Sequence, residues 1–248
     1  MKIFRLLSLL LVVLLASCLN KKKSADTGMP GNESRYVVLA YVTSWGVSTP
    51  ETSCLTHINY AFGHVADDNK GIRIDNEPRL QMIVGLKKEK PSLKVLLSVG
   101  GWGSSRFSEM AANDSTRTAF AADCRRVIDK FGLDGIDIDW EYPGSGTAGI
   151  SFSSADKENF TLLMRDVRQA VGKDKLLTIA TAATGRYYDF RAIEPYVDYV
   201  NIMAYDMEEA PFHHAALHCS DMTEEWSCEK AVAGHIAGGF PVQRLVLG

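Results

Sequence analysis

The amino-acid sequence predicts an α/β fold, a (β/α)8 TIM barrel in which parallel strands alternate with helices. Short apolar runs of strand length alternate with longer segments of helical periodicity. Aromatic or acidic residues that can bind a ligand follow several of these runs, among them Trp102, Glu141 and Asp206. Strands of a barrel end at one face, so these residues favour a barrel over an open doubly wound sheet. Only about seven strands fit, so we expect an incomplete barrel, truncated inside strand seven.

Each expected strand is a mostly apolar run, as is typical of parallel strands covered on both faces. The third run ends in Gly100 and Gly101, which permit tight backbone geometry at a strand end. The expected strands comprise residues 37–42, 56–62, 93–99, 134–140, 176–183, 197–206 and 245–248.

The segments between these strands carry apolar residues at helical spacing. The clearest stripe includes Phe160, Leu163 and Val167, in a helix that we expect Ser153 or Ser154 to cap. Cys124 lies on a similar stripe, which predicts a buried thiol. The other expected helices comprise residues 78–90, 105–130 and 224–237.

The N-terminal segment has the pattern of an export signal. A basic start at Lys2 and Arg5 precedes an apolar run that is too short to span a bilayer comfortably. Small residues before Cys18 resemble a bacterial lipoprotein signal over 1–18, which implies lipidation at Cys18. We therefore expect a membrane-anchored lipoprotein of the cell envelope, with an ordinary secreted protein as the alternative. Polar residues over 19–34 predict a flexible tether, which leaves 35–248 as the partial barrel.

Composition restricts the classes of function. Hydrophobic residues make up 46% of the chain and charged residues 23%, which is typical of a globular protein. The formal net charge of −3 is too small to indicate a nucleic-acid partner. The sequence contains neither a phosphate-binding Gly-x-x-x-x-Gly-Lys motif nor a zinc-binding His-Glu-x-x-His motif.

The candidate site centres on the strand that begins at Asp134. Because side chains alternate along a strand, Asp137, Asp139 and Glu141 share one face, and apolar residues occupy the other. Two carboxylates about 5 Å apart repel by roughly 3 kcal/mol at an effective dielectric constant of about 20. One of the three acids should therefore hold a proton near neutral pH. Glu141 lies where the strand opens into a loop, so we expect it to be the general acid.

The pattern Asp134, Asp137, Asp139, Glu141 resembles the signature of glycoside hydrolase family 18. The Trp-Glu-Tyr-Pro continuation is similar to the chitinase branch of that family. The resemblance implies hydrolysis of β-1,4-linked N-acetylglucosamine by substrate-assisted retaining catalysis, in which the 2-acetamido group replaces a protein nucleophile. It implies a chitin or chitooligosaccharide substrate and requires no cofactor or metal.

The resemblance also implies roles for individual residues. Glu141 would be the acid, Asp139 would hold the acetamido N–H, and Asp137 would share a proton or hydrogen bond with Asp139. Tyr205, in a Met-x-Tyr-Asp segment, would position the acetamido carbonyl. The substrate-binding residues implied by matching positions are Tyr41, Phe62, Gly101, Trp102, Tyr142, Met203 and Asp206.

Several alternatives remain open at this stage. The same chemistry serves an endo-β-N-acetylglucosaminidase that cuts N-glycan cores, and a chitin-binding protein without catalysis is a third hypothesis. A metal site is weighed at a cluster of histidines and a cysteine but is disfavoured, because the segment lacks a clear helix. Cys219 and Cys228 could form a disulfide in an oxidising compartment. The residues considered for the metal site are His213, His214, His218 and Cys219.

Overall fold

The computed structural model describes residues 36–221, 223 and 225–248 of the 248-residue chain. The predicted signal (1–18), the lipidation site at Cys18 and the tether (19–34) lie outside the described residues. Within the described part of the chain, no helix has both the length and the apolar character needed to cross a membrane.

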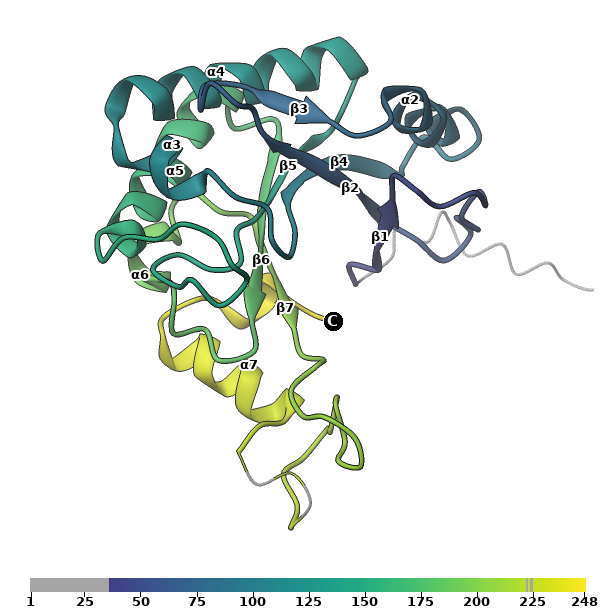
Figure 1. Ribbon diagram of the computed structural model, residues 1–248. Helices are drawn as coiled ribbons and strands as arrows, with labels where there is room; N and C mark the ends of the chain where they lie inside the picture. Colours follow the sequence, from purple (N-terminus) through teal and green to yellow (C-terminus); the bar gives the residue numbers. More distant parts are fainter. Residues whose placement is uncertain (1–35, 222, 224) are drawn as a thin grey trace, which may run out of the picture. The chain divides into compact units, whose positions relative to one another are not determined.

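The parallel strands form one sheet in the order β1-β2-β4-β5-β6-β7-β8, and β3 pairs antiparallel with β2 (Figure 1). Every neighbour along that path is parallel, as right-handed βα units require. This curled sheet confirms the predicted incomplete (β/α)8 barrel. The strands are β1 (Leu39–Thr43), β2 (His57–Val65), β3 (Ile72–Ile74), β4 (Lys94–Gly100), β5 (Gly135–Asp139), β6 (Leu176–Ala182), β7 (Tyr199–Met203) and β8 (Leu245–Leu247).

Helices fill the connections between the strands. Figure 1 shows α3, α4 and α5 packed together beside the sheet. The helices are α2 (Glu77–Gly85), α3 (Phe107–Ala112), α4 (Asp114–Phe131), α5 (Asp156–Val171), α6 (Phe190–Ile193) and α7 (Cys228–Ala237), with short 3-10 turns at Leu86–Lys88 and Val242–Arg244.

Local details differ from the sequence-based expectations. The helix expected over 105–130 is interrupted at Asn113, whose extended backbone (φ −114°, ψ 137°) separates α3 from α4. The expected serine cap of α5 is wrong: Ala155 occupies the N-cap position and makes no side-chain hydrogen bond there. Instead, the Asp156 carboxylate accepts a 2.8 Å hydrogen bond from the backbone N–H of Ser153. The short elements β3 and α6 were not expected.

The core lies between the sheet and its helices. Trp140, just beyond β5, stacks on Phe107 of α3 with a centroid distance of 5.3 Å and an interplanar angle of 13°. Ile136 and Ile138 on the same face of β5 are fully buried. This packing confirms that the apolar face of the acidic strand has a hydrophobic layer behind it, so the acids must project to the other face.

The cysteines of the described residues are free thiols. Cys124 is buried, as predicted, and burial raises its pKa far above the ordinary value. Cys219 is exposed and Cys228 is buried in α7, so the disulfide considered between them is absent from the structure.

Candidate active site

The three acids of β5 and its exit all lie in the interior. Asp137 is fully buried, Asp139 is 4% exposed and Glu141 is 9% exposed. Asp137 lies beside Ser98 of β4 and Thr178 of β6 in the parallel register. The alternation along β5 therefore places three carboxyl groups in succession from the barrel interior to its carboxyl end.

The Asp137 carboxylate accepts hydrogen bonds from four side chains. Its Oδ2 atom accepts from the Tyr41 hydroxyl at 3.0 Å and from the Ser98 hydroxyl at 2.8 Å. Its Oδ1 atom accepts from the Thr178 hydroxyl at 2.5 Å and from Asn201 Nδ2 at 3.1 Å. The sequence analysis did not identify Thr178 or Asn201; the available signal was a polar side chain within an otherwise apolar strand.

Asp139 and Glu141 have a different environment. The Oδ1 atom of Asp139 is buried and has no hydrogen-bond partner among the described residues. Burial raises the pKa of Asp139 well above its ordinary value, and the adjacent Glu141 and Asp137 carboxylates raise it further. Burial also raises the pKa of Glu141. This part of the site therefore retains a proton more readily than free carboxyl groups do.

A cavity of about 560 Å³ opens beside Glu141. Its volume falls within the range of about 300–1,000 Å³ that is typical of small-molecule sites. Six of the residues proposed from the sequence line it, whereas the other five do not: Tyr41, Phe62, Gly101, Asp137 and Asp139. Its lining comprises Trp102, Glu141, Tyr142, Ala182, Ala183, Thr184, Met203, Tyr205, Asp206, Met207 and Trp226.

Two aromatic residues define the rim near Glu141. Trp102 is 63% exposed and its ring meets the Tyr142 ring edge-on at a centroid distance of 6.4 Å. Tyr142 in turn stacks on Tyr187, with centroids 4.7 Å apart and planes 6° apart. Trp226, which also lines the cavity, was missed because it lies in a loop that no strand pattern marks. These rings offer flat faces and edges to an amphipathic ligand.

Tyr205 and Asp206 follow β7 at the same end of the sheet. Burial, followed by the charges of Asp139 and Glu141, raises the pKa of Tyr205 to about 12, so the phenol remains a hydrogen-bond donor near neutral pH. Asp206 has a left-handed backbone (φ 49°), and its carboxylate lies 3.3 Å from the ring of His214. Tyr205 thus presents a neutral hydroxyl near the carboxyl groups.

Glycine is required where β4 ends beside β5. Gly100 has a φ of 133°, and a Cβ atom there would lie 1.9 Å from the carbonyl oxygen of Asp139. Gly101 has a φ of 93°, donates its N–H to the same carbonyl at 2.9 Å, and lies against the Phe62 ring. The two glycines let the backbone of β4 approach Asp139 closely.

The histidine and cysteine cluster considered as a metal site, His213 to Cys219, has no structural support. The described residues contain no group of three or more His, Cys, Asp or Glu side chains placed to hold a metal ion. His214 instead contacts Asp206, and His218 contacts Glu229 through its Nδ1 atom at 2.9 Å.

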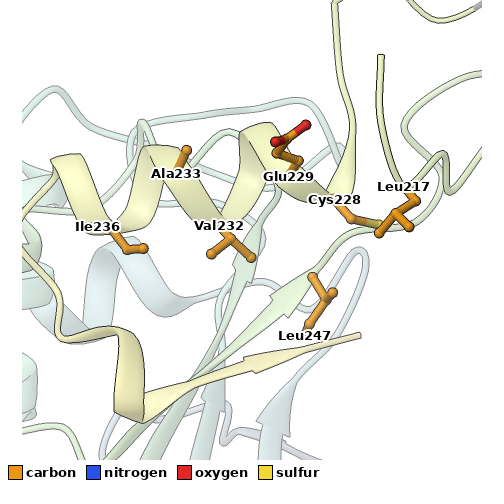
Figure 2. Close-up of a pocket in the computed structure, with 7 residues that line it drawn as sticks. All are labelled: Leu217, Cys228, Glu229, Val232, Ala233, Ile236 and Leu247. Carbon is orange, nitrogen blue, oxygen red and sulfur yellow. The ribbon is translucent and has the colours of Figure 1, made fainter. Parts of the chain in front are cut away.

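A second cavity of about 380 Å³ lies between α7 and β8 (Figure 2). Its lining is almost entirely apolar, and Glu229 supplies the single carboxylate in it. It brings together no set of groups for acid–base chemistry. Its lining comprises Leu217, Cys228, Glu229, Val232, Ala233, Ile236 and Leu247.

Comparison with known proteins decides the family. The profile of glycosyl hydrolases family 18 matches residues 37–248. The chain belongs to glycoside hydrolase family 18.

The first acid of the family signature, Asp134, lies at the amino end of β5 and does not line the cavity. Its carboxylate contacts Lys87 at 2.6 Å and accepts the Val95 N–H at 2.9 Å. It therefore ties neighbouring segments together at that end of the strand.

Members of family 18 match the chain in sequence and in structure. Probable chitinase 2 of Drosophila melanogaster is 33% identical over 223 residues, which cover 79% of this chain and 45% of that protein. Chitotriosidase-1 of Mus musculus is 30% identical over 245 residues, which cover 85% of this chain and 52% of that protein. The chain thus spans about half the length of the curated relatives it matches.

Solved structures of family 18 domains share the fold. The chitinase domain of the spore coat protein CotE from Clostridium difficile superimposes with a TM-score of 0.82 at 34% identity, covering 90% of this chain and 67% of that one. A family 18 N-acetylglucosaminidase from Paenibacillus barengoltzii gives a TM-score of 0.79 at 37% identity, covering 86% of this chain and 68% of that one.

Proposed function

We propose that this protein hydrolyses β-1,4 linkages between N-acetylglucosamine units in chitin or chitooligosaccharides. The observation that supports this most is Glu141 at the wall of the cavity, with buried Asp139 and Asp137 behind it. The chitinases among the relatives support the same substrate class. A neutral glycosidic oxygen needs a proton donor as it leaves, and a carboxyl group with a raised pKa supplies one near neutral pH.

The proposed reaction has two steps and needs no protein nucleophile. Glu141 protonates the glycosidic oxygen while the 2-acetamido oxygen of the substrate attacks the anomeric carbon, which forms an oxazolinium ion. Glu141 then accepts a proton from the water that opens this ion, so the anomeric configuration is retained. Asp139 holds the acetamido N–H and stabilises the positive charge, and the Tyr205 hydroxyl positions the acetamido carbonyl.

The proposed sugar contacts fall into two groups. Trp102, Tyr142, Met203 and Asp206 line the cavity and can touch a sugar directly. In the other group, the Tyr41 hydroxyl is bonded to Asp137, and Phe62 packs against Gly101. We therefore assign Tyr41, Phe62 and Gly101 to shaping the site from behind. The four residues that line the cavity are assigned to substrate binding.

Chitooligosaccharides of three to six units, offered to the wild-type protein, test the proposal. We expect shorter oligomers, with the new reducing end released first as the β-anomer. A high-mannose glycoprotein in a parallel reaction tests the endo-β-N-acetylglucosaminidase alternative, and pull-down on insoluble chitin tests the non-catalytic alternative. Glycan release without oligomer cleavage, or chitin binding without any cleavage, would replace the proposed activity.

We also propose export and lipidation at Cys18, which would anchor the protein to a bacterial cell envelope. The basic start, the short apolar run and the small residues before Cys18 support this. Labelled palmitate should be incorporated by the wild type and not by Cys18→Ala. Equal labelling of both proteins would exclude this site.

A further inference from the structure

Trp102, at the rim of the cavity, lies on a glycine-rich loop that follows β4. Its ring is 63% exposed and meets the Tyr142 ring edge-on at a centroid distance of 6.4 Å. The glycines on either side, Gly101 and Gly103, have φ angles of 93° and 77°, which other residues rarely adopt. Because glycine restricts the backbone least, the position of the ring depends on the contacts that hold this loop.

A histidine of the neighbouring strand β2 holds the loop. Ser104 follows Trp102 and closes a turn, in which its N–H donates to the Gly101 carbonyl at 2.9 Å. The Ser104 hydroxyl lies 2.9 Å from Nδ1 of His64. Both side chains are half-buried, which strengthens the hydrogen bond relative to one in water. The contact therefore ties the exit of β4 to β2.

Asp75 fixes the orientation of the His64 ring. Its Oδ2 atom lies 3.0 Å from His64 Nε2. A carboxylate only accepts hydrogen bonds, so Nε2 carries hydrogen and Nδ1 is left to bind Ser104. Asp75 is itself held, because Arg73 donates to its Oδ1 atom at 2.5 Å and its own N–H donates to the Phe62 carbonyl at 3.1 Å. The short strand β3, which ends just before Asp75, brings this carboxylate to β2.

We propose that His64 is a positioning residue that fixes the Trp102 ring before a sugar arrives. Asp75 orients the His64 ring, and His64 holds the turn that carries Trp102. The consequence rests on the proposed function: a sugar can stack on a fixed ring without ordering the loop, so part of the entropic cost of binding is avoided. Such binding stabilises the ground state and the transition state alike, so it lowers KM and leaves kcat nearly unchanged.

Ser104→Ala tests this, because alanine removes the hydroxyl that His64 binds, whereas Ser104→Thr keeps a hydroxyl. Asp67→Asn is the matched control: Asp67 lies on the loop between β2 and β3 and pairs with Arg106 at 3.4 Å, but its side chain is 98% exposed, so the pair contributes little. The kcat and KM on chitotetraose are measured with and without Trp102→Ala. NMR relaxation of ¹⁵N-labelled tryptophan, with Trp102→Ala assigning the indole signal, reports the mobility of the ring.

In Ser104→Ala we expect KM to rise about fivefold, since one hydrogen bond is lost, while kcat stays within about twofold of the wild-type value. The order parameter of the Trp102 indole N–H should fall by about 0.2 in the protein without substrate. Ser104→Thr and Asp67→Asn should match the wild type in both measurements. In the Trp102→Ala background, Ser104→Ala should leave KM unchanged, because the ring that the turn positions is absent.

The NMR measurement needs no substrate, so this proposal and the proposed function can fail separately. A lower order parameter in Ser104→Ala, in a protein that cleaves no oligomer, would support the positioning role and reject the activity. An order parameter that is the same in Ser104→Ala and wild type would overturn the proposal, whatever the activity. A KM that rises equally with and without the Trp102 ring would also overturn it, because Ser104 would then act through another group.

Discussion

At the scale of single residues, Asp139 carries a cost that the fold must offset. It is buried, it faces two other carboxyl groups, and one of its oxygens has no partner in the described structure. Its pKa is raised in the folded state by burial first and by Glu141 second. Unfolding therefore releases a proton above the ordinary aspartate pKa of about 3.9, and the contribution of Asp139 to stability falls as pH rises through the window above that value.

Asp139→Asn should therefore stabilise the protein at pH 7 while it abolishes hydrolysis, because the amide is neutral in both the folded and the unfolded state. The gain in melting temperature should shrink as pH falls and vanish below about 4, the ordinary aspartate pKa, where the wild-type carboxyl is protonated in both states. Thermal unfolding of both proteins from pH 3 to 8 measures this. A gain that does not change with pH, or a loss at pH 7, would contradict the assigned direction of the pKa shift.

At the scale of elements, the junction of β4 and β5 determines where Asp139 lies. The strands approach so closely at Gly100 that no side chain fits between its Cα atom and the Asp139 carbonyl. Gly132, which ends α4, provides a comparison: its φ is also positive at 69°, but a Cβ atom there would meet nothing within 4 Å.

Gly132→Ala should cost about 1 kcal/mol through its left-handed backbone alone. Gly100→Ala should cost about 2–4 kcal/mol, because overlap with the Asp139 carbonyl adds to the backbone strain. It should also reduce hydrolysis, since the strand must move. Urea unfolding and chitotetraose hydrolysis of both variants provide the comparison. Equal losses of stability would show that the two strands can separate without cost.

At the scale of the whole molecule, the alternation of short apolar runs with segments of helical spacing was sufficient to predict the architecture. Buried parallel strands are apolar on both faces, so the runs that form β4 and β6 stand out against helices with one apolar stripe. The prediction failed where local backbone geometry decides. The break at Asn113 is an extended backbone, and the start of α5 is held by a hydrogen bond from the Ser153 N–H to the Asp156 carboxylate; periodicity reveals neither.

The candidate site was also predicted only in part: its acids were found, and several of the residues around them were not. The acids of β5 lie within a few residues of one another, so alternation alone groups them. Thr178, Asn201 and Trp226 come from distant segments that only the folded sheet brings together. Their spacing along the chain therefore carried no signal for a shared site.

The account depends on Glu141 donating a proton to the glycosidic oxygen. Hydrolysis of chitotetraose by Glu141→Gln, with binding of the same oligomer measured by calorimetry, tests this most directly. We predict that kcat falls by about 10³-fold or more, because the general acid and base is lost, while the Kd stays within about threefold of the wild-type value. A Glu141→Gln protein that retains more than about a tenth of the wild-type kcat would contradict the account.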